Sequence, residues 1–336
     1  MRRAPWAWAG LALVLAAAAL AGLLAGTERI PWRHVLALIA QPSVREADPT
    51  GAQIVLMLRL PRVMAAAMAG ACLSVSGVAL QSLLQNPLAD PYVLGVSAGA
   101  SAGAAVVIAL GLVSALAGFA IPVAALAGAL AATALVFGLA RSGGRMSGPL
   151  LLLSGVVVAS VLGSLVSMIL YLSGAQDRMQ AILLWTMGGF SEADGTRVCL
   201  LAPVAIAGAG ALWAMGRGLN LLAFGEDPAR FLGADVDRVR SRVLFLAALL
   251  TACAVAVGGV IGFVGLIVPH AARRIVGPDH RALLPAAFLG GAAFLVLADL
   301  AARTVHPPME VPVGLLTGVL GGPFFLGLLR AKAGKP

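Results

Sequence analysis

The chain has 336 residues, is 60% hydrophobic and only 11% charged, and carries a formal net charge of +9. Soluble domains are about half apolar and about a quarter charged, so this composition excludes an ordinary soluble protein and predicts an integral membrane protein. The basic residues are scattered between apolar runs and do not form a stripe with aromatic residues, which argues against a nucleic-acid-binding protein.

The cysteines and the N-terminus add little chemistry. Cys72, Cys199 and Cys253 all fall in apolar runs without the spacing of metal ligands. An odd and unclustered set predicts buried thiols rather than a disulfide framework or a zinc site. At the N-terminus, two arginines precede an apolar run that extends to Gly26, a pattern shared by signal peptides and first membrane spans. Because the whole chain is apolar, we expect an uncleaved first span.

Apolar runs long enough to cross a bilayer, roughly 20 residues each, recur along the chain. They lie near residues 6–26, 60–84, 92–113, 117–140, 149–172, 197–216, 282–302 and 311–329. We therefore predict an all-α integral membrane protein in which residues 1–336 form one polytopic unit, with short surface helices between the spans.

The run 243–269 is long for a single span, and arginines flank it on both sides, within 238–242 and within 273–281. As one helix it would place these two clusters on opposite sides of the membrane, whereas the positive-inside rule favours both in the cytoplasm. We therefore expect it to fold back as two short helices that turn at the glycines within 258–262. The chain then has about ten spans, with both termini in the cytoplasm.

The stretch from Arg59 to Ser101 is the most informative part of the chain. Two arginines enclose a Leu-Pro pair, an apolar run follows, and the turn QNPLADP at 85–91 leads to a second run rich in Gly, Ala and Ser. The two prolines of that turn, four residues apart, cannot sit inside one regular helix. We predict a helical hairpin in the membrane with its tip in water, and its small residues predict close helix packing.

Three connections are longer than simple turns. Residues 27–55 carry three prolines and several charges, so we expect an outer loop that is in part interfacial. Residues 173–196 contain a short apolar segment before two glycines, which predicts a short helix at the outer surface. On the inner side, the Glu-Asp-Pro sequence within 218–240 predicts the start of a short amphipathic helix. This inner segment is either an ordinary solvated loop or a docking element for a soluble partner.

No motif of a membrane enzyme or of an ATPase occurs in the sequence. The phosphate loop G-x-x-x-x-G-K-[ST] is absent, as are H-E-x-x-H and G-x-S-x-G. The acidic residues lie in loops or at the ends of spans, with Asp299 the most deeply placed. Proton- and sodium-coupled carriers usually hold ionisable residues near the middle of the membrane. A secondary transporter or channel that acts alone is therefore the less favoured alternative.

Six motifs occur in a fixed order: RLPR…NPLADPYVLGVSAGA, LLLLSGVVVAS at 150–160, WTMGGF at 185–190, LNLLAFGEDPARFLGADVDRVR at 219–240, GGVIGFVGLIVPHAARRIVGPDHR at 258–281 and DLAAR…EVPVGLLTGVLGGPFF at 299–325. Together they resemble the permeases of ABC importers for iron-siderophore complexes, haem and cobalamin. Each motif is weak alone, but the resemblance extends from Arg59 to Leu329.

The resemblance implies ten spans per subunit and a homodimer or pseudo-dimer of permeases in a bacterial inner (plasma) membrane, with the homodimer favoured. It implies two separate ATPase subunits in the cytoplasm and a periplasmic or lipid-anchored substrate-binding protein outside. Membrane lipid is the remaining partner, and no nucleic acid, cofactor or metal site is implied. The chain would be a transporter subunit rather than an enzyme, with ATP hydrolysed by the separate ATPase.

Carried over residue by residue, the resemblance assigns two groups near the membrane surfaces. The arginines that match a binding-protein docking group are Arg59, Arg62 and Arg303. For Arg59 and Arg62, the alternative is plain anchoring at the membrane interface. The residues that match a cytoplasmic gate are Asn86, Leu88, Ser147 and Gly148. The alternative for them is a purely structural turn.

The resemblance also assigns a pathway and a coupling element. Segment 149–172 should line the pathway, and its serines either make it mildly polar or serve helix packing; they are Ser154, Ser160, Ser164 and Ser167. The residues that match the ATPase coupling helix in the loop 218–240 are Glu226, Asp227, Arg230, Phe231, Leu232 and Gly233.

No residue identifies the substrate. A metal chelate is implied, and an iron-siderophore complex is favoured over haem or cobalamin because such members are the larger share of the family. His270 and His280 invite interpretation as haem ligands, but both fall on the cytoplasmic side in the ten-span arrangement, so we expect structural roles.

Overall fold

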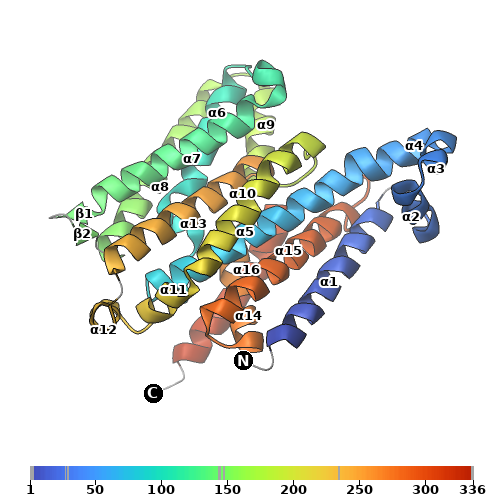
Figure 1. Cartoon of the computed structure of the whole chain (residues 1–336). Coiled ribbons are helices and arrows are strands. Elements are labelled where there is room, and N and C mark those ends of the chain that lie inside the picture. The colour runs from blue at the N-terminus through green and yellow to red at the C-terminus, as the bar shows by residue number, and fades with distance from the viewer. Residues whose placement is uncertain are drawn as a thin grey trace.

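The computed structural model describes residues 4–26, 28, 30–142, 145–146, 148–233 and 235–333. Within these residues the chain forms a bundle of long helices that run side by side (Figure 1). The helices that cross the bundle are α1 (Ala4–Leu24), α5 (Leu60–Leu83), α6 (Val96–Ala109), α7 (Ala120–Leu139), α8 (Gly148–Leu172), α10 (Gly195–Ala214), α13 (Val236–Gly258), α14 (Val264–Val276), α15 (His280–Thr304) and α16 (Val313–Ala333).

Short elements connect the long helices. They are α2 (Trp32–Ala40), α3 (Pro42–Ala47), α4 (Pro49–Ala52), the π-helical turn η1 (Gln53–Arg59), the 3-10 turns η2 (Pro91–Leu94) and η3 (Ala115–Gly118), the strands β1 (Arg141–Ser142) and β2 (Arg145–Met146), and the helices α9 (Gln176–Met187), α11 (Gly216–Leu222) and α12 (Glu226–Phe231). The two strands pair antiparallel with Arg141 opposite Met146.

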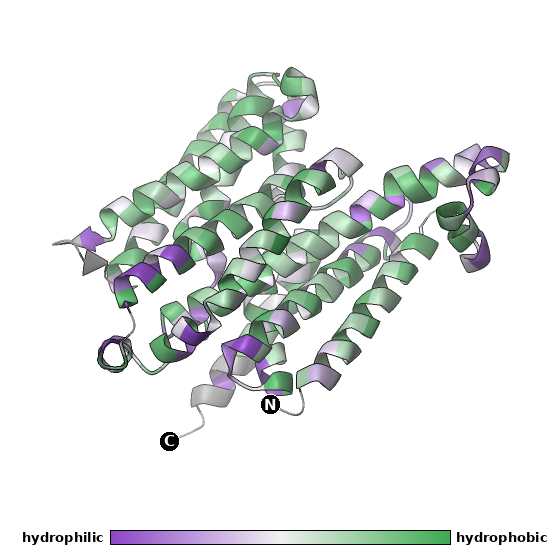
Figure 2. Ribbon diagram, in the orientation of Figure 1, coloured by the Kyte–Doolittle hydropathy of each residue, from purple (hydrophilic) through white to green (hydrophobic). Residues whose placement is uncertain are grey.

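The bundle has two distinct ends. The end that carries both chain termini, α12 and the β1–β2 hairpin is called the terminal end, and the opposite end, which carries α2 to α4 and α9, is called the distal end (Figure 1). Polar residues gather toward these two ends, and apolar residues dominate the helices between them (Figure 2). This distribution is expected of a protein whose middle lies in lipid.

The helix lengths agree with a membrane-spanning fold. Within the described residues, seven helices are long and apolar enough to cross a bilayer, one of them the continuous stretch 49–83. α6 and the apolar part of α16, Val313–Gly327, are shorter, and α14 has only 13 residues. The prediction of an all-α membrane protein with about ten crossing helices and short surface helices is thus confirmed, although not every crossing helix has full length.

The run 243–269 is divided between two helices, as predicted, but not into two short ones. α13 has 23 residues, whereas α14 has only 13. The chain reverses between Gly259, at φ +66°, and Phe263, at φ +67°, both in the left-handed region. Glycine adopts this conformation readily, which explains why the glycine-rich segment is the place of the reversal.

The distal connection 27–55 is more helical than predicted. Three helices occupy it, and the stretch that ends with α5 already begins at Pro49. Pro42 and Pro49 stand in the first positions of α3 and α4, where a missing backbone N–H costs no hydrogen bond. These prolines therefore start helices and do not mark a loop. In 173–196, the predicted short helix is α9, with 12 residues.

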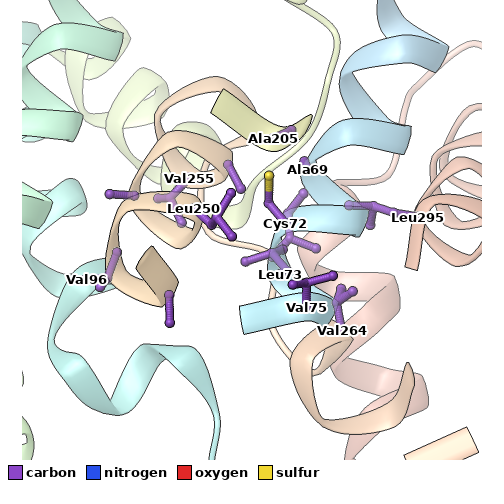
Figure 3. Packing of buried hydrophobic residues seen from close by; sticks show 14 of the residues in the cluster. Ala69, Cys72, Leu73, Val75, Val96, Ala205, Leu250, Val255, Val264 and Leu295 are labelled. Carbon is purple, nitrogen blue, oxygen red and sulfur yellow. The ribbon is translucent and has the colours of Figure 1, made fainter. Parts of the chain in front are cut away.

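α5 lies at the centre of the bundle, packed against α10, α13, α14 and α15. Its small residues bring backbones into contact: a Cβ at Gly70 would lie 2.1 Å from the Gly291 oxygen, and one at Gly77 2.1 Å from the Gly265 oxygen. Cys72 points among apolar side chains of the neighbouring helices (Figure 3). The prediction of buried thiols holds for Cys72, whereas Cys253 is half-buried and Cys199 is exposed.

The predicted helical hairpin is present as α5, a turn, η2 and α6. The prediction that its tip lies in water holds for Gln85, which is exposed, but not for Ala89 and Pro91, which are buried. The hydroxyl of Tyr92 donates to the Ile261 carbonyl and accepts from the Ile261 N–H, both at 3.0 Å. The tip therefore folds back against the connection between α13 and α14.

Candidate functional site

The segment predicted to couple to an ATPase forms an exposed helix at the terminal end. α12 begins at Glu226 and Asp227 and is followed by Gly233, at φ +84°. Phe231 is 91% exposed and Leu232 is 65% exposed, although both are large apolar side chains. Apolar side chains that stand out from a polar end of a protein mark an interaction surface.

Two ion pairs connect α12 to the start of α13. Glu226 pairs with Arg240, and Arg230 pairs with Asp237 at 3.1 Å. The Arg230–Asp237 pair is exposed on both sides, at 43% and 60%, so water screens it and it contributes little to stability. The consequence of the two pairs is geometric: they hold α12 in one orientation relative to α13, with Phe231 left exposed.

The predicted gate residues are divided between the turn after α5 and the start of α8. Asn86 and Leu88 are in the turn after α5, where the Asn86 Oδ1 accepts the Leu88 N–H at 3.0 Å. Gly148 is the first residue of α8. Ser147 lies outside the described residues.

A cavity of 170 Å³ at the terminal end, here called the terminal cavity, lies between five elements. It is lined by the end of α5, the start of α8, the last residue of α11, the start of α12 and two residues of α13, namely Leu83, Leu84, Gln85, Gly148, Pro149, Leu151, Leu222, Glu226, Arg240 and Leu244. The structure thus brings the predicted gate residue Gly148 and the predicted coupling residue Glu226 to one cavity, while Asn86 and Leu88 are not among its lining residues.

Two of the three predicted docking arginines are buried at the distal end. Arg59 is 6% exposed and Arg303 is 9% exposed. Arg59 Nη1 donates to the carbonyls of Leu23 at 2.8 Å and Leu24 at 3.1 Å, and Arg303 Nη2 donates to the Gly22 carbonyl at 3.1 Å. The last carbonyls of a helix have no partner within it, so the two cations cap the C-terminus of α1.

This arrangement corrects the sequence-based interpretation of Arg59 and Arg303, because their guanidinium groups are used inside the chain. Arg62 differs: its Nη2 pairs with the buried Asp299 at 2.9 Å and with Glu310 at 2.9 Å. The Glu310 side chain is 44% exposed, so this network reaches the surface. Arg303 joins it through Asp299 at 3.2 Å.

A larger cavity of 480 Å³, here called the distal cavity, opens beside the Arg62 network. Its lining mixes apolar side chains with charged ones, and includes Arg62, Ile108, Ile121, Trp185, Phe190, Glu192, Arg197, Glu310 and Val311. Next to it the backbones of three segments meet: the Gly189 N–H donates to the Gly258 carbonyl at 2.8 Å, and the Val313 N–H donates to the Gly188 carbonyl at 3.0 Å. α9 is therefore joined to α13 and α16 at this end.

The predicted pathway serines divide into two groups on α8. Ser160, Ser164 and Ser167 are exposed, and each hydroxyl donates to the carbonyl four residues earlier, at 2.9 to 3.1 Å. Their spacing of four and three residues places them on one face of the helix. Ser154 is 9% exposed and lies on the opposite, buried side with Gly155, whose added Cβ would meet the Val93 carbonyl. Ser154 thus packs inside the chain and is withdrawn from the predicted lining.

The sequence profile of the FecCD transport family matches residues 13–331 of this chain. The chain belongs to the FecCD transport family. It is 43% identical over 303 residues to the cobalamin import system permease protein BtuC of Halobacterium salinarum, which covers 90% of this chain and 80% of that protein. It is also 43% identical over 281 residues to the hemin transport system permease protein HmuU of Yersinia pestis, which covers 82% of each. A solved structure of a metal-chelate type ABC transporter in an inward-facing conformation matches with a TM-score of 0.85 at 32% identity, over 98% of this chain and 99% of that chain.

As a FecCD-family permease, the chain is a multi-pass transporter subunit of an ABC importer and not an enzyme, and ATP is hydrolysed by a separate ATPase chain. Among the described residues, no group of three or more His, Cys, Asp and Glu side chains is arranged to hold a metal ion. The structure gives the two histidines that resembled haem ligands local contacts: His280 Nδ1 lies 2.7 Å from the Asn220 Oδ1, and the His270 ring packs edge-on against Phe324.

Asn220 also links α11 to the start of α15. Its Nδ2 donates to Asp279 Oδ1 at 2.7 Å, and this hydrogen bond holds the pKa of the Asp279 carboxyl below its usual value. Asp279 in turn caps α15 by accepting the Arg281 N–H.

Three features of this FecCD-family permease escaped the sequence analysis. They are the pairing of Arg62 with Asp299 and Glu310, the backbone junction at Gly188 and Gly258, and the contact of Gln85 with α11. Asp299 stood out in the sequence as the most deeply placed acid, and a buried acid requires a cationic partner. One partner, Arg303, is four residues away on the same helix, whereas the other, Arg62, is 237 residues away in the chain, so only the fold identifies it.

Proposed function

We propose that the chain is one of two permease copies that carry a metal chelate across the inner membrane of a bacterium. In this proposal the terminal end faces the cytoplasm, so both termini are cytoplasmic, and α12 meets one of two ATPase subunits there. The observation that carries the proposal is the exposure of Phe231 at 91% on a helix held to α13 by ion pairs. The sequence contains no phosphate loop, so energy from ATP must enter through contact with another chain.

At the distal end we propose the docking site for a periplasmic or lipid-anchored binding protein. The exposed part of the Arg62 network, at Glu310, and the charged rim of the distal cavity support this assignment. Charged groups at an interface rim steer association more than they add affinity. Arg59 and Arg303 contribute behind this surface, by fixing α1 against α5 and α15.

We further propose that the exposed face of α8 meets the second permease copy and the transport pathway. Ser160, Ser164 and Ser167 give this face a mildly polar stripe, and apolar side chains such as Val161, 64% exposed, lie beside it. Asn86, Leu88, Ser147 and Gly148 are the proposed gate at the cytoplasmic end of that pathway.

The chelate is the least determined part of the proposal. Two relatives of equal identity, 43%, are named for cobalamin and for hemin, so identity alone does not choose between cargoes. An iron-siderophore complex remains the favoured substrate, as in the sequence analysis, with haem and cobalamin as alternatives.

Transport by the reconstituted importer tests both the class and the cargo. The permease is placed in liposomes with its ATPase and binding protein, and uptake of labelled ferric siderophore, haemin and cobalamin is measured with and without ATP. We expect ATP-dependent uptake of one of the three. Uptake that proceeds without the ATPase and follows an ion gradient would instead support a secondary transporter and overturn the proposal.

A further inference from the structure

α5 ends in a backbone conformation that its sequence does not favour. The Asn86 N–H donates to the Gln81 carbonyl at 3.1 Å and the Gln85 N–H donates to the Ser82 carbonyl at 3.3 Å. This pair of hydrogen bonds is the Schellman pattern, which places the residue after the helix cap in the left-handed region. That residue is Gln85, with φ +49°, at a position where glycine or asparagine is usual. A glutamine there is conformationally strained, and such strain calls for a compensating contact.

The side chain of Gln85 makes that contact. Its Nε2 donates to the carbonyl of Leu222, the last residue of α11, at 3.0 Å. Because a carbonyl oxygen only accepts hydrogen bonds, the NH₂ group and not the amide oxygen must face it. One turn earlier on α5, the Ser82 hydroxyl donates to the Leu219 carbonyl at 3.2 Å. Two side chains from the end of α5 thus hold the last turn of α11.

Gln85 stands where the elements of the proposed coupling machinery meet. α12 begins at Glu226, only four residues after Leu222. A Cβ at the intervening Gly225 would lie 3.7 Å from the Gln85 Nε2. Gln85 is exposed and lines the terminal cavity together with Glu226 and Gly148, and the next residue in the chain is Asn86 of the proposed gate.

We propose that Gln85 is a positioning residue that transmits displacement of α12 to the turn after α5. This turn, which holds the proposed gate residues Asn86 and Leu88, is here called the gate turn. This inference rests on the proposed function, which assigns ATPase docking to α12 and gating to Asn86. When the ATPase moves α12, the Leu222 carbonyl moves with it, and the hydrogen bond carries that movement to Gln85. The main chain of Gln85 is strained, so the turn depends on this bond for its position, and a shift of the bond partner changes the conformation of the turn.

The test separates transmission from folding, because glycine suits the backbone of position 85 better than glutamine does. Gln85→Gly removes the side-chain bond and the strain together, so the unfolding temperature of the permease should be unchanged or higher. Gln85→Arg keeps an N–H donor of sufficient length and serves as the matched control. Both variants are compared with the parental protein in the complete importer, with ATPase and binding protein, in liposomes.

In that assay the quantities measured are ATPase assembly, ATP hydrolysis without substrate, and substrate molecules transported per ATP. For Gln85→Gly we expect unchanged assembly and hydrolysis, and transport per ATP that falls about fivefold, the factor that loss of one hydrogen bond typically carries. Gln85→Arg should stay within about twofold of the parental ratio, since a donor is retained.

Two results would overturn the inference. One is a Gln85→Gly importer that transports at the parental ratio. The other is a Gln85→Gly permease whose unfolding temperature and ATPase assembly fall together with transport, which would show a purely structural role. Failure of the parental chain itself to assemble with an ATPase would instead contradict the proposed function, so the two failures are distinguishable.

Discussion

α5 and α8 are helices of nearly equal length, 24 and 25 residues, with opposite surroundings. In the most apolar 18-residue segment of the stretch that contains α5, 83% of the residues are buried, whereas in that of α8 only 22% are buried. Half of the 24 residues of α5 are Ala, Gly, Ser or Cys, and the helix packs mainly against α10, α13, α14 and α15. α8, in contrast, presents Leu and Val outward. The difference shows that hydrophobicity alone does not mark the core of a membrane protein. Small residues mark contacts within the chain, because they permit close backbone approach.

The largest effect is expected where backbones touch in α5. Gly77→Val would place a Cβ 2.1 Å from the Gly265 oxygen, and backbone cannot move aside as a flexible side chain can. We expect a loss of more than about 3 kcal/mol or failure to fold, the upper range for overpacked cores. Gly163→Val on α8 is the matched control, because nothing lies within 4 Å of its added Cβ. Thermal unfolding and size-exclusion chromatography in detergent measure both. Equal unfolding temperatures of the two variants would contradict the conclusion that α5 is packed inside the chain more closely than α8.

The next effect concerns the cap of α1 beside the distal end of α5. Arg59→Met leaves the Leu23 and Leu24 carbonyls without their donor, in a buried place. Such loss typically costs about 1–3 kcal/mol, so the unfolding temperature should fall clearly. Arg178→Met is the control, since Arg178 also donates to a helix-end carbonyl, that of Ala109, but at an exposed site. A drop for Arg178→Met as large as for Arg59→Met would show that burial does not set the cost.

Substitutions on a surface that is exposed in the single chain, such as that of α8 or α12, should weaken binding to partners without changing the stability of the permease. Phe231→Ala combined with Leu232→Ala removes the exposed apolar side chains of the coupling segment. We expect unchanged unfolding of the permease and roughly tenfold weaker ATPase assembly, equivalent to about 1.4 kcal/mol. Binding of purified ATPase to the permease in nanodiscs measures this. A double variant that assembles and transports at the parental rate would place the coupling elsewhere, for example at the loop 273–281.

The smallest effects compare serines. The Ser74 hydroxyl of α5 is buried and donates to the Ala287 carbonyl at 2.7 Å, so Ser74→Ala should cost about 1 kcal/mol. Ser164 of α8 donates only to its own helix, so Ser164→Ala should change stability by less than about 0.5 kcal/mol. The unfolding temperatures of the two single variants decide this. A larger loss for Ser164→Ala would mean that α8 is packed against more than lipid or water.

The spans and the short helix α12 could be predicted from the sequence, because apolar length and helix-start signals are local properties. The sequence analysis misjudged Ser154, since all four serines of α8 lie in one apolar run and only the packing of Gly155 against Val93 separates their faces. It also read Arg59 and Arg303 as outward-facing. Their partners are carbonyls of α1, 36 and 281 residues away in the chain, and backbone carbonyls leave no trace in a sequence.

The uninterrupted stretch from residue 49 to residue 83 has a further consequence. Its 35 residues extend about 50 Å at 1.5 Å per residue, whereas the hydrocarbon core of a bilayer is about 30 Å thick. The first turns of this stretch, which α2 and α3 precede, extend beyond the neighbouring helices at the distal end and must therefore stand clear of the lipid chains (Figure 1). A soluble protein that approaches the membrane from this side would meet the projecting turns before it reaches the headgroups, and the continuous helix connects that contact to the interior of the bundle.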